Sequence, residues 1–74
     1  MRVVIKTYYY IEDEDYKEIV ACMKYNHLTY RKVAKELGLS CAYLHDVIHN
    51  RRPMNQKIMN YFKNKGVRFV WEED

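Results

Sequence analysis

The sequence predicts a mainly α fold with a small β component, in which four helices are flanked by an amino-terminal and a carboxy-terminal strand. Apolar residues recur at helical spacing through the middle of the chain, and caps and a turn glycine separate the helical segments. Both ends alternate in the manner of strands. With 74 residues, 49% of them apolar and 15% aromatic, the chain suits one small domain over residues 1–74 and is too apolar for disorder.

The two predicted strands lie near residues 2–11 and 67–72. The first, RVVIKTYYYI, is dense in β-branched and aromatic residues, which favour strands. In the second, GVRFVWEE, alternation puts Val67, Phe69 and Trp71 on one face. Because a two-stranded sheet alone is marginal in water, we expect these strands to pack on the helices, to pair as an antiparallel ribbon, or to pair with another chain.

Apolar spacing between the strands predicts the four helices. The first, within residues 12–26, places side chains at i, i+3, i+4 and i+7, the spacing of one buried stripe: Tyr16, Ile19, Val20 and Met23. The second is expected from the N-cap Thr29 through Leu37, the third over residues 41–49, and the last near residues 55–65. Their predicted core residues are Val33, Ala34, Leu37, Leu44, Val47, Ile48, Ile58, Met59 and Phe62.

A turn at residues 38–40 joins the second and third predicted helices. Gly38 can adopt the left-handed conformation that ends a helix, and Ser40 can cap the next one. On that next helix, the step of about 100° per residue turns the apolar residues inward. It leaves five others facing outward: Ala42, Tyr43, His45, Asp46 and His49. An exposed helix of this size fits the major groove of DNA, where base edges can be distinguished.

Charge is distributed unevenly along the chain. Residues 1–23 carry a net charge of −2, residues 24–65 carry +7, and residues 66–74 carry −2, which gives the whole chain +3. A basic centre between acidic ends indicates a surface that faces a polyanion. The alternative interpretation is an ordinary surface with scattered, solvated lysines.

The chain resembles the Cro and repressor helix-turn-helix family, also called the XRE family, through TYRKVAKELGLSCAYLHDVIHNRRP, residues 29–53. The matching positions are the apolar-alanine pair of the second family helix, the turn glycine, two buried positions of the recognition helix and the basic loop after it: Val33-Ala34, Gly38, Leu44, Val47 and Asn50-Arg51-Arg52-Pro53. The match is close over these residues and continues loosely to Phe62. The chain is therefore expected to contain a helix-turn-helix core at about residues 29–53.

The resemblance implies a sequence-specific transcriptional regulator that binds double-stranded DNA as a dimer, with the recognition helix, residues 41–49, in the major groove. Phage repressors of the Cro type and antitoxins both fit it. The residues implied to contact bases are Cys41, Ala42, Tyr43 and Asp46. Small residues at the start of the helix allow close approach to thymine methyl groups, and a carboxylate can accept from cytosine. An ordinary solvated side chain is the alternative for both Tyr43 and Asp46.

The predicted phosphate contacts are Arg31, Lys32, His45, His49, Arg51 and Arg52. The two consecutive arginines at 51 and 52 are the best supported, because non-specific affinity comes chiefly from neutralised phosphates. Arg31 and Lys32 fall in the first turn of the helix that crosses the DNA backbone in this geometry, and the amino end of that helix can itself accept a phosphate. The two histidines are expected to be exposed polar groups near phosphate.

No metal site, cofactor or catalytic activity is predicted. Cys41, His45 and His49 recur at i, i+4 and i+8, but positions eight residues apart lie about 12 Å apart along a helix, too far for three ligands on one ion. The chain has no glycine-rich phosphate loop, nucleophile elbow or paired acidic motif. We therefore expect neither an enzyme nor a small-molecule substrate.

The aromatic termini suggest a second kind of interaction, between proteins. Tyr8, Tyr10, Phe69 and Trp71 are predicted to form a homodimer interface, because aromatic residues are enriched at the centre of contacts. They could instead cap a small core within one chain. A different function also stays open, in which the terminal strands dock a protein by edge pairing, as in a protein-binding module or an antitoxin-like partner, and the helix pair is only a scaffold.

The expected location is the cytoplasm. No run approaches the roughly 18 apolar residues of a membrane-spanning helix, and the opening residues lack the apolar region and cleavage site of a signal peptide. Cys22 and Cys41 form no CxxC pair. We therefore expect an intracellular protein with reduced thiols and no membrane partner.

Overall fold

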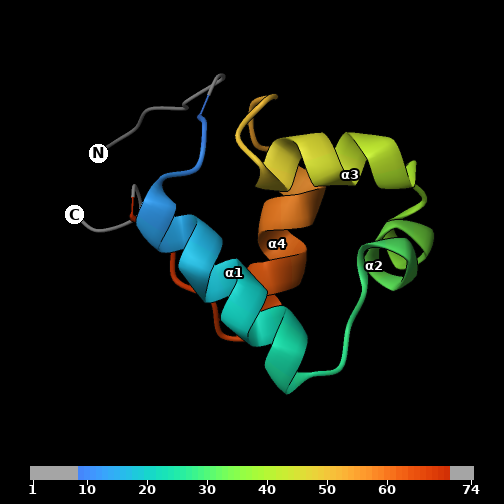
Figure 1. Cartoon of the computed structure of the whole chain (residues 1–74), viewed down its shortest axis with the longest axis horizontal. Coiled ribbons are helices and arrows are strands. Elements are labelled where there is room, and N and C mark those ends of the chain that lie inside the picture. Colours follow the sequence, from blue (N-terminus) through green and yellow to red (C-terminus); the bar gives the residue numbers. More distant parts are fainter. Residues whose placement is uncertain (1–8, 71–74) are drawn as a thin grey trace.

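Four helices make up most of residues 9–70, the part of the chain that the computed structural model describes (Figure 1). Their bounds are Asp13–Tyr25 for α1, Tyr30–Leu37 for α2, Cys41–Ile48 for α3 and Gln56–Asn64 for α4. The mainly helical fold predicted from the sequence is confirmed, and each helix lies where the apolar spacing placed it.

Short connections with side-chain caps set where the helices begin. The hydroxyl of Thr29 accepts from the N–H of Lys32 at the start of α2, and the hydroxyl of Ser40 accepts from the N–H of Tyr43 at the start of α3. Between them Gly38 has φ of +71°, the left-handed conformation that ends α2. The predicted caps and turn glycine are thus confirmed.

The turn sets α3 at a steep angle to α2. In Figure 1, α3 runs across the top of the molecule while α2 is seen nearly end-on, and the two helices pack against each other. α4 runs down the centre of this view from beneath α3, and α1 crosses in front of it. One side of α3 therefore faces the rest of the molecule, and its opposite side faces solvent.

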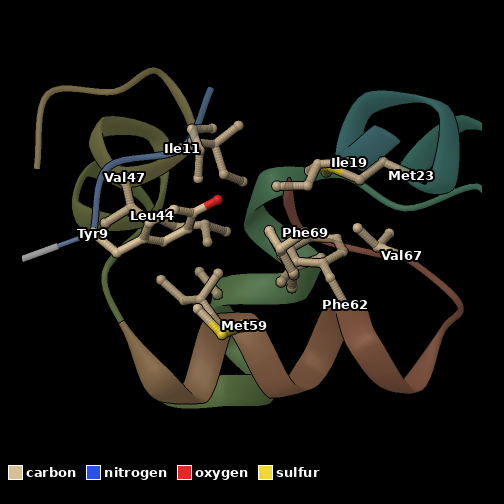
Figure 2. Close-up of a cluster of buried hydrophobic side chains, with 14 residues drawn as sticks. Tyr9, Ile11, Ile19, Met23, Leu44, Val47, Met59, Phe62, Val67 and Phe69 are labelled. Atoms are coloured by element: carbon tan, nitrogen blue, oxygen red, sulfur yellow. The ribbon is translucent and has the colours of Figure 1, made fainter. Parts of the chain in front are cut away.

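A single apolar core lies between the four helices (Figure 2). It contains Tyr9, Ile11, Ile19, Met23, Val33, Ala34, Leu44, Val47, Ile48, Ile58, Met59, Phe62, Val67 and Phe69. The residues predicted to anchor α3 and α4 are all in this set, whereas Leu37 on α2 is only partly buried. Burial of three apolar residues on the eight-residue α3 explains how so short a helix is held, since tertiary packing supplies most helical stability.

The buried stripe of α1 differs from the predicted one. Ile19 and Met23 are buried as expected, but Tyr16 is exposed and Val20 only half-buried, and Asp15 occupies the remaining inward position with no exposed surface. The apolar spacing of the sequence predicted that Tyr16, and not its neighbour Asp15, is buried. The structure favours Asp15 because its carboxyl group finds hydrogen-bond donors inside the protein, as buried polar groups require.

Asp15 forms hydrogen bonds with the segments on both sides of the helical region. Its Oδ2 accepts from the hydroxyl of Tyr9 and from the backbone N–H of Glu12, the latter at 2.9 Å. Its Oδ1 accepts from the backbone N–H of Val70, also at 2.9 Å. One side chain therefore joins the segment before α1, the first turn of α1 and the segment after α4.

The predicted strands are not confirmed, since residues 9–70 contain no strand. Burial alternates there as in a strand, with Tyr9 and Ile11 buried around Tyr10, and Val67 and Phe69 buried around an exposed position. The backbone groups bond elsewhere: the carbonyl of Tyr9 accepts from the N–H of Met54 at 2.6 Å, and the N–H of Val70 reaches Asp15. Apolar residues at every second position indicate that alternate side chains are buried. They do not require the backbone to be hydrogen-bonded to a neighbouring strand. The predicted strand residues 2–8 and 71–72 lie outside the described residues.

Within residues 9–70, none of the helices combines the length and the apolar character needed to cross a bilayer. Cys22 and Cys41 are both free thiols, the first partly buried and the second exposed.

Candidate nucleic-acid interface

The amino end and outer side of α3 carry the residues predicted to contact bases. Cys41 and Ala42 are exposed in its first turn, and Tyr43 and Asp46 are partly exposed. The core anchors on the opposite side, above all Leu44, leave this surface open to solvent. A helix with small side chains at its exposed start can approach a groove closely.

Two pairs of cationic residues, one before and one after α3, supply positive charge. Arg31 and Lys32 are exposed in the first turn of α2. Arg51 and Arg52 follow α3 and leave 68% and 58% of their side chains exposed. These exposures allow all four cations to reach a phosphate.

Asp46 is ion-paired to both arginines that follow α3. Its Oδ1 lies 3.6 Å from Nη1 of Arg51, and its Oδ2 lies 3.5 Å from Nε of Arg52. The backbone carbonyl of Asp46 also accepts from the N–H of Arg51 at 2.8 Å, and Asn50 adopts a left-handed φ of +66° that folds the chain back. From the sequence, Asp46 was predicted to contact a base and the two arginines to contact phosphates, with no interaction between them. The signal in the sequence was an acidic residue near the end of a helix, followed five and six residues later by two arginines.

Tyr43 links this ion-paired group to α4. The guanidinium carbon of Arg52 lies 5.8 Å from the centre of the Tyr43 ring, within the range of a cation–π contact. The Tyr43 hydroxyl accepts from Nδ2 of Asn55 at 3.3 Å, and Oδ1 of Asn55 caps α4. Tyr43 therefore holds the start of α4 and one arginine in place, and Asn55 is a supporting residue that sequence reasoning missed.

His45 and His49 lie on the flank of α3 that faces α1 and α2, instead of pointing straight outward as predicted. Their rings stack with centres 4.0 Å apart. The Tyr30 hydroxyl is hydrogen-bonded to Nε2 of His49 at 3.1 Å, and the Tyr30 ring meets His45 edge-on. Tyr16 of α1 approaches the other side, 5.4 Å from His49 between ring centres. Both histidines are thus partly buried members of an aromatic cluster.

This environment changes how His49 titrates. Burial lowers the pKa of His49 below its ordinary value, and His45 and Arg51 act in the same direction while Asp46 opposes them. Burial, with smaller contributions from Tyr16 and Cys41, raises the pKa of Tyr30, so its hydroxyl keeps its proton at neutral pH. His49 is therefore mostly neutral near pH 7 and adds little positive charge for the phosphate contact predicted from the sequence.

We expect the free energy of unfolding to decrease as the pH falls below about 6.5, the ordinary histidine value. The unfolded chain takes up a proton at His49 before the folded chain does, so the stability present above that pH is lost toward the lower folded pKa. Urea unfolding at pH 7.5 and 5.5 measures this, and His49→Gln should weaken the dependence. His27→Asn, at an exposed left-handed position, is the control and should retain it. An unchanged pH dependence in His49→Gln would contradict the assignment.

The predicted dimer residues that the structure describes differ in their exposure. Tyr10 is 46% exposed and remains available to a partner. Phe69 is only 1% exposed because it fills the core of its own chain, so the expectation that it contacts a partner does not fit this structure. Tyr8 and Trp71 lie outside the described residues.

The described side chains of residues 9–70 include no group of three or more His, Cys, Asp or Glu residues placed to hold a metal ion. Searches for similar proteins among protein-family models, curated proteins and solved structures gave no match. The candidate interface accordingly depends on the residues and geometry of this chain.

Proposed function

We propose that the protein is a sequence-specific, double-stranded DNA-binding regulator of transcription in which α2, the turn and α3 form a helix-turn-helix. The observation that carries this proposal is the exposed start and outer side of α3, preceded by Arg31 and Lys32 and followed by Arg51 and Arg52. A groove-sized helix provides base readout, and the cations provide the electrostatic affinity for the backbone.

In the proposed complex, α3 enters the major groove with its amino end toward the base edges. Cys41 and Ala42 allow close approach and contact thymine methyl groups, and Asp46 can accept from a cytosine amino group. Arg51, Arg52 and the first turn of α2 bind phosphates and fix the register. A homodimer would present two α3 helices to half-sites roughly 34 to 36 Å apart, one turn of DNA.

The test is a binding titration of the whole protein with random-sequence duplex DNA under reducing conditions, followed by selection from a random pool. We expect binding at low ionic strength, with a slope of log affinity against log salt near −3.6 per protomer for four phosphate contacts. Selection should enrich one motif. Absence of a duplex complex at roughly 20 mM salt would overturn the proposal. Salt-independent elution from DNA would favour the protein-binding alternative.

A further inference from the structure

We propose that Asp46 is a specificity-determining residue of this interface because it competes with DNA phosphates for Arg51 and Arg52. The inference rests on the proposed DNA-binding function and adds a role for the carboxylate inside it. In the free protein each carboxylate oxygen of Asp46 approaches one guanidinium, at 3.6 Å and 3.5 Å. A carboxylate in this position offers the arginines the same charged oxygen acceptors that a phosphate offers.

The ion pairs of Asp46 are placed so that a polyanion can displace them. The Asp46 side chain is 30% exposed and both arginines are more than half exposed, so solvent and ligands reach all three. Surface pairs of this kind are weak, and each alters an equilibrium by about two- to fivefold at most. Asp46 therefore lowers affinity without blocking the site.

The surrounding contacts hold the carboxylate against the arginines. The N–H of Arg51 donates to the carbonyl of Asp46 at 2.8 Å, which fixes the chain reversal after α3. Arg52 also lies against the Tyr43 ring, and Tyr43 is tied to Asn55 at the start of α4. The chain reversal after α3 thus places both arginines beside the Asp46 carboxylate, and the Tyr43 ring gives Arg52 a second contact there.

Competition of this kind improves discrimination between DNA sequences. When a phosphate takes Arg51 or Arg52, the Asp46 carboxylate loses the cations that it contacts in the free protein. Every duplex incurs this penalty, and only a site that offers Asp46 a donor, such as a cytosine amino group, offsets it. Specificity here comes from an unfavourable interaction with the wrong ligand as well as a favourable one with the right ligand.

The test replaces Asp46 with asparagine, which keeps the shape and removes the charge. Asp46→Asn should bind random-sequence duplex about 3- to 10-fold more tightly than the wild type and elute later from heparin, a polyanion without bases. In an Arg51→Ala, Arg52→Ala background the same substitution should change duplex affinity by less than about twofold, because the competing partners are gone. Glu14→Gln, an exposed carboxylate on α1, controls for net charge.

Three results would overturn the inference. Unchanged or weaker duplex and heparin binding by Asp46→Asn would mean that Asp46 does not compete, or that it positions the arginines. An equal gain in both backgrounds would show direct repulsion of DNA by the carboxylate. A gain no larger than that of Glu14→Gln would reflect net charge alone. If wild-type protein binds no duplex while Asp46→Asn still elutes later from heparin, the DNA function fails and the competition for the arginines stands.

Discussion

Replacing Arg51 and Arg52 together with alanine is expected to weaken binding to duplex DNA of every sequence by roughly 30-fold at about 0.1 M salt. The figure follows from about 1 kcal/mol for each exposed contact between an arginine and a phosphate, the upper end for surface charge pairs, since 1.4 kcal/mol corresponds to a tenfold change. The slope of log affinity against log salt should become shallower by about 1.8 per protomer, because two fewer phosphates are neutralised. Titration of one fluorescent duplex at four salt concentrations measures both quantities.

The DNA motif that the double variant selects distinguishes the loss of phosphate contacts from the loss of a residue that contacts bases. A phosphate contact carries no direct base information, so the double variant should select the same motif as the wild type from a random pool. Folding should change little, since exposed ion pairs contribute little to stability.

The matched control is Lys17→Ala with Lys24→Ala, which removes the same charge from the exposed surface of α1. We expect this control to weaken binding only slightly, through net charge. Equal affinities of the arginine variant and the wild type would contradict the phosphate assignment, and equal losses in the two double variants would mean that net charge alone attracts DNA.

The helices and their caps could be predicted because local chemistry determines them. Thr29, Gly38 and Ser40 act through backbone geometry within a few residues, and the spacing of Leu44 and Val47 on α3 defines its buried side. The interaction between Asp46 and the arginines was not predicted. It depends on the chain reversing after α3, and sequence spacing alone does not give the direction of that turn.

The terminal segments show a different limit of sequence reasoning. Alternation at residues 9–11 and 67–69 correctly indicated alternating burial, but it could not say whether the backbone bonds to a strand or to other groups. The same holds for the histidines on α3. Helical geometry placed His45 and His49 away from the core, yet only the packing of Tyr16 and Tyr30 turns them into a partly buried cluster.

The largest effect on stability is expected from Asp15→Ala, which should lower the free energy of unfolding by about 3 kcal/mol. Removing the carboxyl group deletes three hydrogen bonds, a buried one from the Tyr9 hydroxyl and two part-buried ones from the N–H groups of Glu12 and Val70. Each hydrogen bond lost costs about 1 kcal/mol. For a domain of this size the midpoint of thermal unfolding should fall by roughly 15 °C. Circular dichroism during heating and in urea measures both quantities.

Two further variants keep the prediction testable if Asp15→Ala does not fold. Tyr9→Phe removes one donor and keeps the ring, so it should lose about 1 kcal/mol. Asp13→Ala removes an exposed carboxylate two residues earlier and should lose less than about 1 kcal/mol, through its favourable interaction with the start of α1. Similar losses from Asp13→Ala and Asp15→Ala would show that the buried carboxyl group does not hold the flanking segments. A loss confined to Asp15→Ala and Tyr9→Phe means that one acidic residue, absent from the predicted apolar stripe, ties both ends of the described chain to α1.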